Sequence, residues 1–327
     1  MSKNKKLKYF LFLITILLAT IVTYLPTFNN DFTNWDDHLQ VTSNPDITEL
    51  SFKSIHTIFS SFYVGMYQPI TTFIFTIENA FFGLNATAFH SVSLGFHLLN
   101  TILVFWLITL ITKRKDIAIL ATSLFAVHPM FVEAVAWVSA RSTLVYSFFY
   151  LASIISYLYY LKEEKVKYLV IALCLFLLSL LTKAMAITLP FLLILIDFYY
   201  NRKLNSKKII IEKIPFFILS ILFGIIAIKG RQIAGHFTGG FTFFDKIFIM
   251  IYQIFWYIFK FFIPTELSAF YQNPKKINGF LPVIYYVSPF FIILVGFLTY
   301  RFKKYWKKIV FSFFFFLISI AIVLKIV

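Results

Sequence analysis

The stretch Lys3–Pro26, KNKKLKYFLFLITILLATIVTYLP, places a cluster of lysines directly before a long apolar run. The apolar part, Tyr9–Pro26, approaches the length that a helix needs to cross a bilayer. It lacks the small-residue cleavage site of a secretory signal peptide. Because Lys and Arg favour the cytoplasmic side, the stretch predicts an uncleaved first span with a cytoplasmic N-terminus.

The whole chain has the composition of a polytopic membrane protein. Of its 327 residues, 60% are hydrophobic and 13% are charged, whereas soluble domains carry about 25% charged residues. The net charge of +16 comes from blocks of Lys and Arg between apolar runs. The positive-inside bias explains such blocks, so no nucleic-acid partner is expected. The single cysteine, Cys174, excludes a disulfide framework and a Cys-rich metal site.

The apolar runs predict an all-α bundle of about nine to ten transmembrane helices in one membrane domain, 1–327. The expected spans are 9–26, 88–112, 116–140, 143–161, 168–182, 184–200, 214–229, 281–300 and 309–326. Segment 245–263 is also apolar, but a crossing there would place the basic block 301–308 outside. We therefore expect this segment to be re-entrant or to lie on the outer surface, with its lysines reaching the interface.

This topology leaves two long outer loops, 27–87 and 230–280. In the first, Asn44–Glu49 is typical of a helix start. Apolar residues then recur at helical spacing: Phe52, Ile55, Phe59 and Phe62. They predict an interfacial helix that lies on the outer leaflet, or one that packs against the bundle.

Ionisable and polar groups at membrane depth are costly, and each is a candidate functional residue. In the second span, His90, Ser93, His97 and Asn100 share one helix face. This stripe faces either a polar cleft or a neighbouring helix that it binds through hydrogen bonds.

The third span contains Pro129, which should kink or break the helix. His128 and Glu133 flank this proline and lie in the outer half of the membrane. A break would also allow Glu133 to form a structural ion pair with Arg141, two turns further along.

Segments 168–182 and 184–200 are too short for two full spans, so the turn between them should lie below the outer surface. Lys183 in that turn is then a buried cation, suited to the phosphate of a lipid headgroup. Snorkelling of the side chain to the interface is the alternative. Arg231, in the second outer loop, is a further candidate cation.

Asp36 and Asp37 follow Trp35 in the first outer loop, and adjacent carboxylates repel each other. A carboxylate can act as a general base for an attacking hydroxyl. Lys183, Arg141 and the histidines could stabilise the charge on a departing phosphate. Two alternatives stay open: a loop or cap role for the aspartates, and a divalent metal held by Asp36, Asp37 and Glu133.

Several ordered motifs together resemble the transmembrane portion of the tetratricopeptide-containing O-mannosyltransferase-like family, a group within the GT-C glycosyltransferases. The matching residues are Phe32–Asp37 (FTNWDD), Asn44–Pro45, Tyr67–Thr71 (YQPIT), Phe82–Asn85 (FGLN), His90, His97, Asn100, Leu124–Pro129 (LFAVHP), Val132–Val138 (VEAVAWV), Arg141 and Thr182–Pro190 (TKAMAITLP). The similarity is dense over 28–200 and thin afterwards.

The resemblance implies a GT-C-like fold and a polyprenyl-phosphate-linked sugar donor, with a mannose-like hexose as one candidate. The sugar would pass with inversion to an extracytoplasmic hydroxyl of a protein Ser or Thr or of a glycan. Asp36 would be the base and Asp37 its support. No further cofactor is expected. The residues expected to bind the donor phosphate or substrate are Lys183, Arg141, His128, Glu133, His90, His97, Gln68 and Arg231.

Three positions depart from the family pattern. Gln68 stands where relatives commonly have Arg or His, Phe131 where many have His, and Thr143 where an Asp usually follows the Arg. Each departure removes a titratable group near the expected site, so donor or acceptor choice could differ.

Two other classes of function stay open: a transporter or flippase of a lipid-linked glycan, and a non-catalytic subunit of an envelope-glycan assembly. The charges gather in the outer half without a visible repeat, which favours the enzyme over a transporter. No tetratricopeptide repeat follows the last apolar run, so we expect a partner to recruit the acceptor, unless the acceptor needs none. The expected location is the cytoplasmic membrane of a bacterium, with the site facing outside.

Overall fold

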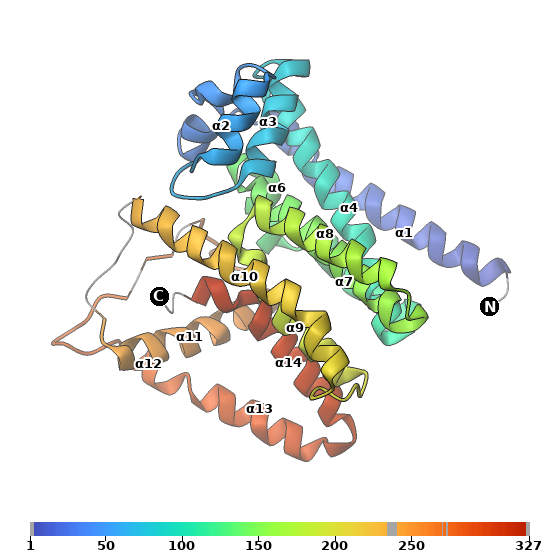
Figure 1. Ribbon diagram of the computed structural model, residues 1–327. Coiled ribbons are helices and arrows are strands. Elements are labelled where there is room, and N and C mark those ends of the chain that lie inside the picture. The colour runs from blue at the N-terminus through green and yellow to red at the C-terminus, as the bar shows by residue number, and fades with distance from the viewer. Residues whose placement is uncertain (1–2, 234–240, 270, 273, 325–327) are drawn as a thin grey trace. The chain divides into compact units, whose positions relative to one another are not determined.

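The computed structural model describes residues 3–233, 241–269, 271–272 and 274–324 (Figure 1). These residues are mainly helical and contain two isolated β-bridges, Tyr63 with Met66 and Ile277 with Phe280. They fall into two compact units, Met1–Ile187 with Ile214–His236, and Thr188–Lys213 with Phe237–Val327. The sequence predicts a single membrane domain over 1–327, and this division into two compact units does not test that prediction.

The first unit is a bundle of apolar helices: α1 (Lys3–Tyr24), α4 (Ala86–Thr112), α5 (Lys115–Val127), α6 (Val132–Ala136), α7 (Ser142–Glu163), α8 (Val166–Thr182) and the part of α10 (Lys207–Ile233) that begins at Ile214. Tight turns join α4 to α5 and α7 to α8, and Lys113 and Glu164 cap the preceding helices in the left-handed conformation. These turns place the paired helices side by side, and α1 packs along α4 and α5 (Figure 1).

Small hydroxyl side chains join α7 to α8. Ser153 Oγ donates to the Ala172 carbonyl at 2.7 Å, and Ser179 Oγ donates to the Tyr146 carbonyl at 2.9 Å. Short side chains allow close approach of helix backbones, and hydrogen bonds between helices contribute to stability in lipid. The α7–α8 pair is therefore a firm support for the residues near Ser142 and Thr182, at the end opposite to the turn that joins the two helices.

The predicted break at Pro129 is confirmed. Helix α5 ends at Val127, and the short helix Pro129–Phe131 leads into α6, so the two parts differ in direction by 52°. Proline has no N–H for the preceding turn, which explains why the helix ends there. The break lets the chain turn again at Trp137 before it enters α7.

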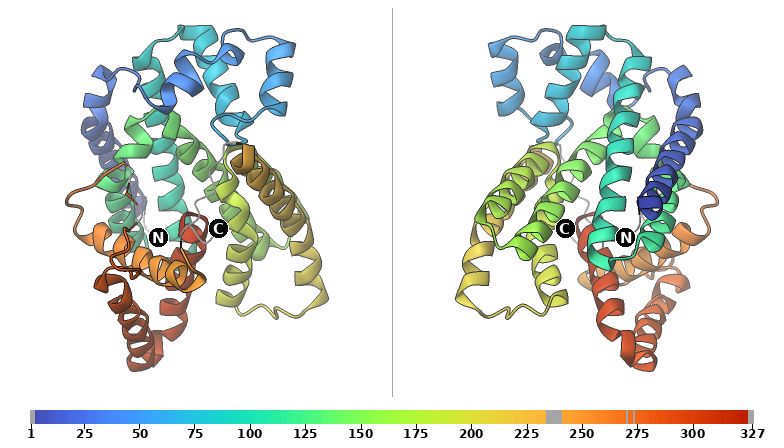
Figure 2. Two further views of the ribbon diagram at one scale, coloured as in Figure 1. Left: turned by 90° about the vertical axis from the view of Figure 1, so that its left-hand side faces the viewer. Right: turned by 90° about the vertical axis from the view of Figure 1, so that its right-hand side faces the viewer.

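The first outer loop folds into short elements: η1 (Leu25–Asn29), η2 (His38–Thr42), η3 (Pro45–Ile47), α2 (Phe52–Ser60) and α3 (Pro69–Phe82). They lie together at one end of the first unit (Figure 2). The helix start predicted at Asn44 is only the cap of the single turn η3, through a 3.0 Å bond from Asp46 N. Helix α2 begins later because Ser51 provides a new cap for it.

Helix α2 exposes part of the apolar face that its sequence predicts, since Phe52 is 94% and Phe59 37% exposed. Ile58, which the prediction did not include, is fully buried. The helix therefore packs on the first unit and also presents apolar surface.

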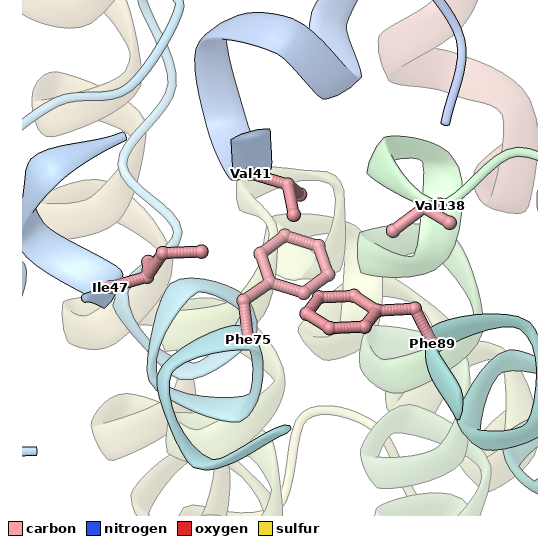
Figure 3. Close-up of a cluster of buried hydrophobic side chains, with 5 residues drawn as sticks. All are labelled: Val41, Ile47, Phe75, Phe89 and Val138. Carbon is pink, nitrogen blue, oxygen red and sulfur yellow. The ribbon is translucent and has the colours of Figure 1, made fainter. Parts of the chain in front are cut away.

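A small apolar core fixes this loop to the bundle (Figure 3). It consists of Val41, Ile47, Phe75, Phe89 and Val138, which come from η2, η3, α3, α4 and the turn before α7. Phe75 and Phe89 stack with ring centroids 5.9 Å apart. Segments that are distant in sequence thus converge next to Asp37 and Ser139.

The second unit contains α9 (Leu189–Tyr199), the first turns of α10, α11 (Phe243–Phe262), α12 (Val283–Val287), α13 (Phe290–Arg301), η7 (Lys303–Tyr305), α14 (Trp306–Ile320) and η8 (Ala321–Leu324). Helix α14 packs against α9, and α11 against α12. Asp197 on α9 is buried, accepting from Arg202 at 2.9 Å and from Lys213 at 2.8 Å. Glu212 binds the same arginine at 2.8 Å, so this cluster of two acids and two bases is a structural feature.

The chain is an all-α polytopic membrane protein, as the sequence predicts. Six helical segments are long and apolar enough to cross a membrane: Leu7–Asn29, Ala86–Thr112, Ser139–Glu163, Lys207–Ile233, Val283–Arg301 and Lys303–Leu324. The bent pair Lys115–Val127 and Pro129–Ala136 would make seven. Two further helices that the sequence predicts as spans, Val166–Thr182 and Ala184–Tyr199, are shorter, so the expected count of nine to ten stays a prediction. Helix α11, expected to lie flat or re-enter, is not among the six.

Candidate active site

Asp37 anchors the first outer loop to the bundle. Its Oδ1 accepts from Ser139 N at 2.8 Å and from Ser139 Oγ at 2.5 Å. Its Oδ2 accepts from Thr33 N at 2.9 Å and from Thr33 Oγ1 at 3.0 Å. The carboxylate is buried and both oxygens are in use. Asp37 therefore joins two segments that are 102 residues apart in sequence.

Asp36, by contrast, is half-buried and makes no hydrogen bond or ion pair among the residues that the structure describes. Burial raises the pKa of Asp36, and the negative charge of Asp37 raises it further. A carboxylate with a raised pKa and free oxygens is suited to accept a proton. The structure thus separates the two neighbours, one held in place and one open.

A second contact of this region involves two tryptophans. The rings of Trp35 and Trp137 stack with centroids 5.6 Å apart. Because Trp35 directly precedes Asp36, and Trp137 lies two residues before Ser139, the stack holds the same two segments as the Asp37 hydrogen bonds. The residues directly before and after Asp36 are therefore both held in place, Trp35 by the ring stack and Asp37 by its hydrogen bonds.

The turn Ser139–Thr143 brings a cation to the same place. Lys183 Nζ donates to Thr143 Oγ1 at 2.8 Å, and Thr143 lies four residues after Ser139, which holds Asp37. Four residues of helix rise about 6 Å and lie on one face. The Asp36–Asp37 loop and the Lys183 ammonium therefore flank the same helical turn.

Lys183 has no carboxylate within ion-pair distance among the described residues, although it interacts electrostatically with Glu133. It follows α8 as its capping residue, in an extended conformation that ends the helix. Thr143 is one of the departures from the family pattern, so Lys183 binds a neutral hydroxyl where an Asp carboxylate is usual.

Arg141 lies inside the turn and is fully buried. Its Nη1 donates to both oxygens of Glu78, at 2.5 and 2.6 Å, and its Nε donates to Ser93 Oγ at 2.9 Å. Nη2 donates to the Phe89 carbonyl at 2.5 Å, and the guanidinium lies over the Phe75 ring. All three nitrogens of Arg141 are therefore in use, and its partner is Glu78 instead of Glu133.

Sequence reasoning missed Glu78. It is a lone carboxylate in the apolar helix α3, and it is buried. A buried acid is rarely left without a cation, so its position in an apolar stretch was an available signal. The sequence did not show which cation would reach it, 63 residues away.

The polar stripe of α4 lies in the bundle interior, as predicted, and it joins helices. His97 Nε2 bonds the Ala126 carbonyl at 2.9 Å, next to the helix end that Pro129 causes. Asn100 Nδ2 donates to the Leu144 carbonyl at 2.8 Å. His90 lies beside the backbone of Asn30 and Asp31, and within the described part of the chain neither of its ring nitrogens has a hydrogen-bond partner.

His128 and Glu133 lie at the break between α5 and α6. His128 Nδ1 accepts from Met130 N at 3.3 Å and caps the turn that starts α6. Glu133 is exposed and belongs to the first turn of α6. Within the described part of the chain, no three His, Cys, Asp or Glu side chains are grouped in a way that could hold a metal ion.

Gln68 and Arg231 complete the predicted set. Gln68 is buried, and its Nε2 donates to Gln40 Oε1 at 2.7 Å. Arg231 is exposed in the last turn of α10, which extends to Ile233 and so continues into the predicted second outer loop. Gly230, next to it, packs closely on the Gly65 carbonyl of the first outer loop.

Fold and site together define a class: a polytopic membrane protein with a carboxylate, a lysine and a buried ion pair around one turn at the end of the bundle. Its relatives are protein O-mannosyl-transferases, so the resemblance expected from the sequence is confirmed. The chain is 28% identical to one from Caenorhabditis elegans over 60% of its own length. It is 30% identical to one from Drosophila melanogaster over 51%, and 32% identical to one from Homo sapiens over 28%.

The chain covers less than a third of these relatives: 29% of the nematode protein, 20% of the fly protein and 10% of the human protein. No family model matches the chain. No solved structure matches it either. All three relatives are animal proteins, so the expected bacterial source stays a prediction.

Proposed function

We propose that this chain is a membrane glycosyltransferase that moves a hexose from a polyprenyl-phosphate carrier to a hydroxyl on the extracytoplasmic side. The Ser139–Thr143 turn is the observation that carries the proposal, because it holds the Asp37 anchor at one end and Lys183 at the other. These two contacts place the segment that carries Asp36 and the Lys183 ammonium at the two ends of one turn. The names of the relatives support this class of reaction.

In the proposed reaction, Asp36 takes the proton of the acceptor hydroxyl as its oxygen attacks the anomeric carbon. A new carbon–oxygen bond forms, and the bond from that carbon to the phosphate oxygen breaks. The polyprenyl monophosphate leaves with the bonding electrons. Because attack and departure occur on opposite faces of the carbon, the configuration inverts. The raised pKa of Asp36 favours its role as the proton acceptor.

Lys183 is the proposed partner of the leaving phosphate. An ammonium without a paired carboxylate can form charge-assisted hydrogen bonds to phosphate oxygens. Stabilising the charge that develops on the leaving group is often a large contribution to catalysis. His128 and Arg231 are further candidates for binding the same phosphate. Glu133 would modulate the charge of Lys183, with which it interacts electrostatically.

Arg141, His90 and His97 act in this proposal as positioning residues. Arg141 is held by Glu78, Ser93 and the Phe89 carbonyl, and so fixes the turn that carries both functional groups. His97 fixes the end of α5 through its bond to Ala126.

The acceptor in this proposal is a protein Ser or Thr hydroxyl, because the relatives carry the name protein O-mannosyl-transferase. A partner protein would bring the acceptor to the site. The N-terminus would lie in the cytoplasm, because lysines precede the first span, and the site would face the opposite side.

Purified protein in lipid nanodiscs, supplied with polyprenyl-phosphate hexose labelled in the sugar, tests this function. We expect label to appear in a Ser/Thr-containing acceptor peptide, or as free sugar when water replaces the acceptor. Absence of donor binding, transfer and hydrolysis would contradict the proposal. In proteoliposomes, movement of the intact labelled lipid across the bilayer without bond cleavage would instead identify a flippase.

A further inference from the structure

Two buried glutamines in the first unit form an incomplete amide pair. Gln68 Nε2 donates to Gln40 Oε1 at 2.7 Å. The side chains are deeply buried, with Gln40 2% exposed and Gln68 1% exposed. Among the described residues, the other half of each amide, Gln40 Nε2 and Gln68 Oε1, has no hydrogen-bond partner.

Two buried amide atoms without hydrogen-bond partners are unusual in a folded protein. Buried polar side-chain atoms are hydrogen-bonded in the large majority of cases, and an unsatisfied group is costly. Here the open atoms are one donor group and one acceptor, on two side chains that touch each other. A sugar hydroxyl both accepts and donates hydrogen bonds, so neighbouring hydroxyls of a pyranose match this combination.

The pair also joins the segment of the proposed base to α3, which contacts the residue before the proposed cation. Gln40 follows Asp36 by four residues, in the short helical segment that continues into η2. Gln68 caps α3, and Thr71 in the first turn of that helix reaches the Thr182 carbonyl at 3.5 Å. Lys183 is the next residue, so the amide pair connects the segments on which both functional groups lie.

We propose that Gln40 and Gln68 form the subsite that recognises the hydroxyls of the transferred sugar, and that this sugar is an uncharged hexose. The inference rests on the proposed function, since a sugar attacked near Asp36 and leaving from a phosphate at Lys183 must lie between them. The amides carry no charge, so a sugar carboxylate or ammonium placed against them would be buried without a counter-charge. Burial of an unpaired charge is strongly unfavourable.

The test compares the affinities of the full-length protein for polyprenyl-phosphate hexose and for bare polyprenyl phosphate. The ratio of the two affinities measures the contribution of the sugar alone. The variants Gln40→Met and Gln68→Met keep side-chain length but remove the hydrogen-bonding groups. We expect either variant to lower the ratio about tenfold, with the affinity for the bare carrier unchanged.

Asn79→Leu is the matched control. This amide lies on the same helix, α3, but its Nδ2 already donates to the Ile47 carbonyl at 3.1 Å. Any general loosening of the loop should appear in this variant too, whereas the affinity ratio should stay at the wild-type value. The wild-type protein should also bind a carrier with a hexuronic acid at least about tenfold less tightly.

The outcomes separate the two proposals. If the wild-type protein prefers the sugar-bearing carrier but both glutamine variants keep that preference, water fills the amide pair and the sugar subsite is refuted, while the proposed function stands. Equal affinity for the hexose and hexuronic acid carriers would refute the preference for an uncharged sugar. If the wild-type protein binds neither carrier, the proposed function fails, and the subsite with it.

Discussion

Replacing Glu78 by Gln would leave the Arg141 guanidinium buried without its counter-charge. The arginine is fully buried, and its Nη1 bonds both Glu78 oxygens, at 2.5 and 2.6 Å. Gln keeps the shape of the side chain but is neutral, and it offers one acceptor oxygen in place of two. The perturbation therefore removes charge and one hydrogen bond while it adds almost no strain.

Loss of one partner from a buried ion pair costs about 3 to 5 kcal/mol of folding free energy. For a protein unit of about 200 residues, each kcal/mol lowers the melting temperature by about 2 to 4 °C. Glu78→Gln should thus lower the melting temperature by roughly 10 °C. Because Arg141 lies between Ser139 and Thr143, transferase activity should fall as well.

Thermal unfolding in detergent, followed by fluorescence-detected gel filtration, would measure this effect. Glu163→Gln is the matched control, because it breaks the exposed Lys165–Glu163 pair at 2.9 Å and should leave the melting temperature unchanged. A Glu78→Gln protein as stable as the wild type would refute the reasoning about the buried pair. The double variant Glu78→Met/Arg141→Met should recover much of the lost stability.

Three further predictions concern the site and its support. Gly230→Ala would place a Cβ 2.6 Å from a backbone carbonyl oxygen and should lower the melting temperature, whereas Gly224→Ala meets open space and should not. Lys183→Ala should weaken binding of polyprenyl phosphate about 10- to 100-fold in a titration, unlike Lys53→Ala on the exposed face of α2. Since the pKa of Asp36 is raised, activity should fall on acidification at a higher pH than for an ordinary aspartate, and a pH–rate profile would show it.

The local features of the fold could be predicted from the sequence. Apolar runs marked the positions of the helices, and Pro129 marked the break after α5. The face shared by His90, His97 and Asn100 follows from helical periodicity alone. These features depend on residues that are close together in the chain, so they can be predicted from a single sequence.

Length and apolarity identify six or seven spans among the described residues, and the two further helices that would make nine are short. Residues 166–199 form two apolar helices that are shorter than a full crossing, with the turn at Lys183 between them. Apolar composition could not show how deep each helix would lie. The short lengths did indicate a buried turn, which is the feature on which the site depends.

The pairings within the site could not be predicted, because they join distant segments. Glu78 meets Arg141 across 63 residues, and Asp37 meets Ser139 across 102. Asp36 and Asp37 have the same chemistry and adjacent positions, yet only the fold makes one a held anchor and the other an open carboxylate. Gln40 had no local signal at all, since its partner is 28 residues away.

The central claim is that Asp36 is the base. The most direct measurement is the turnover of labelled polyprenyl-phosphate hexose by Asp36→Asn, together with donor affinity and melting temperature. Asp31→Asn is the control, because Asp31 is an exposed aspartate of the same loop whose Oδ1 accepts from the N–H of its neighbour Phe32. We predict that Asp36→Asn loses at least about 100-fold in turnover with donor affinity and stability retained. Turnover near that of the wild type would contradict the account.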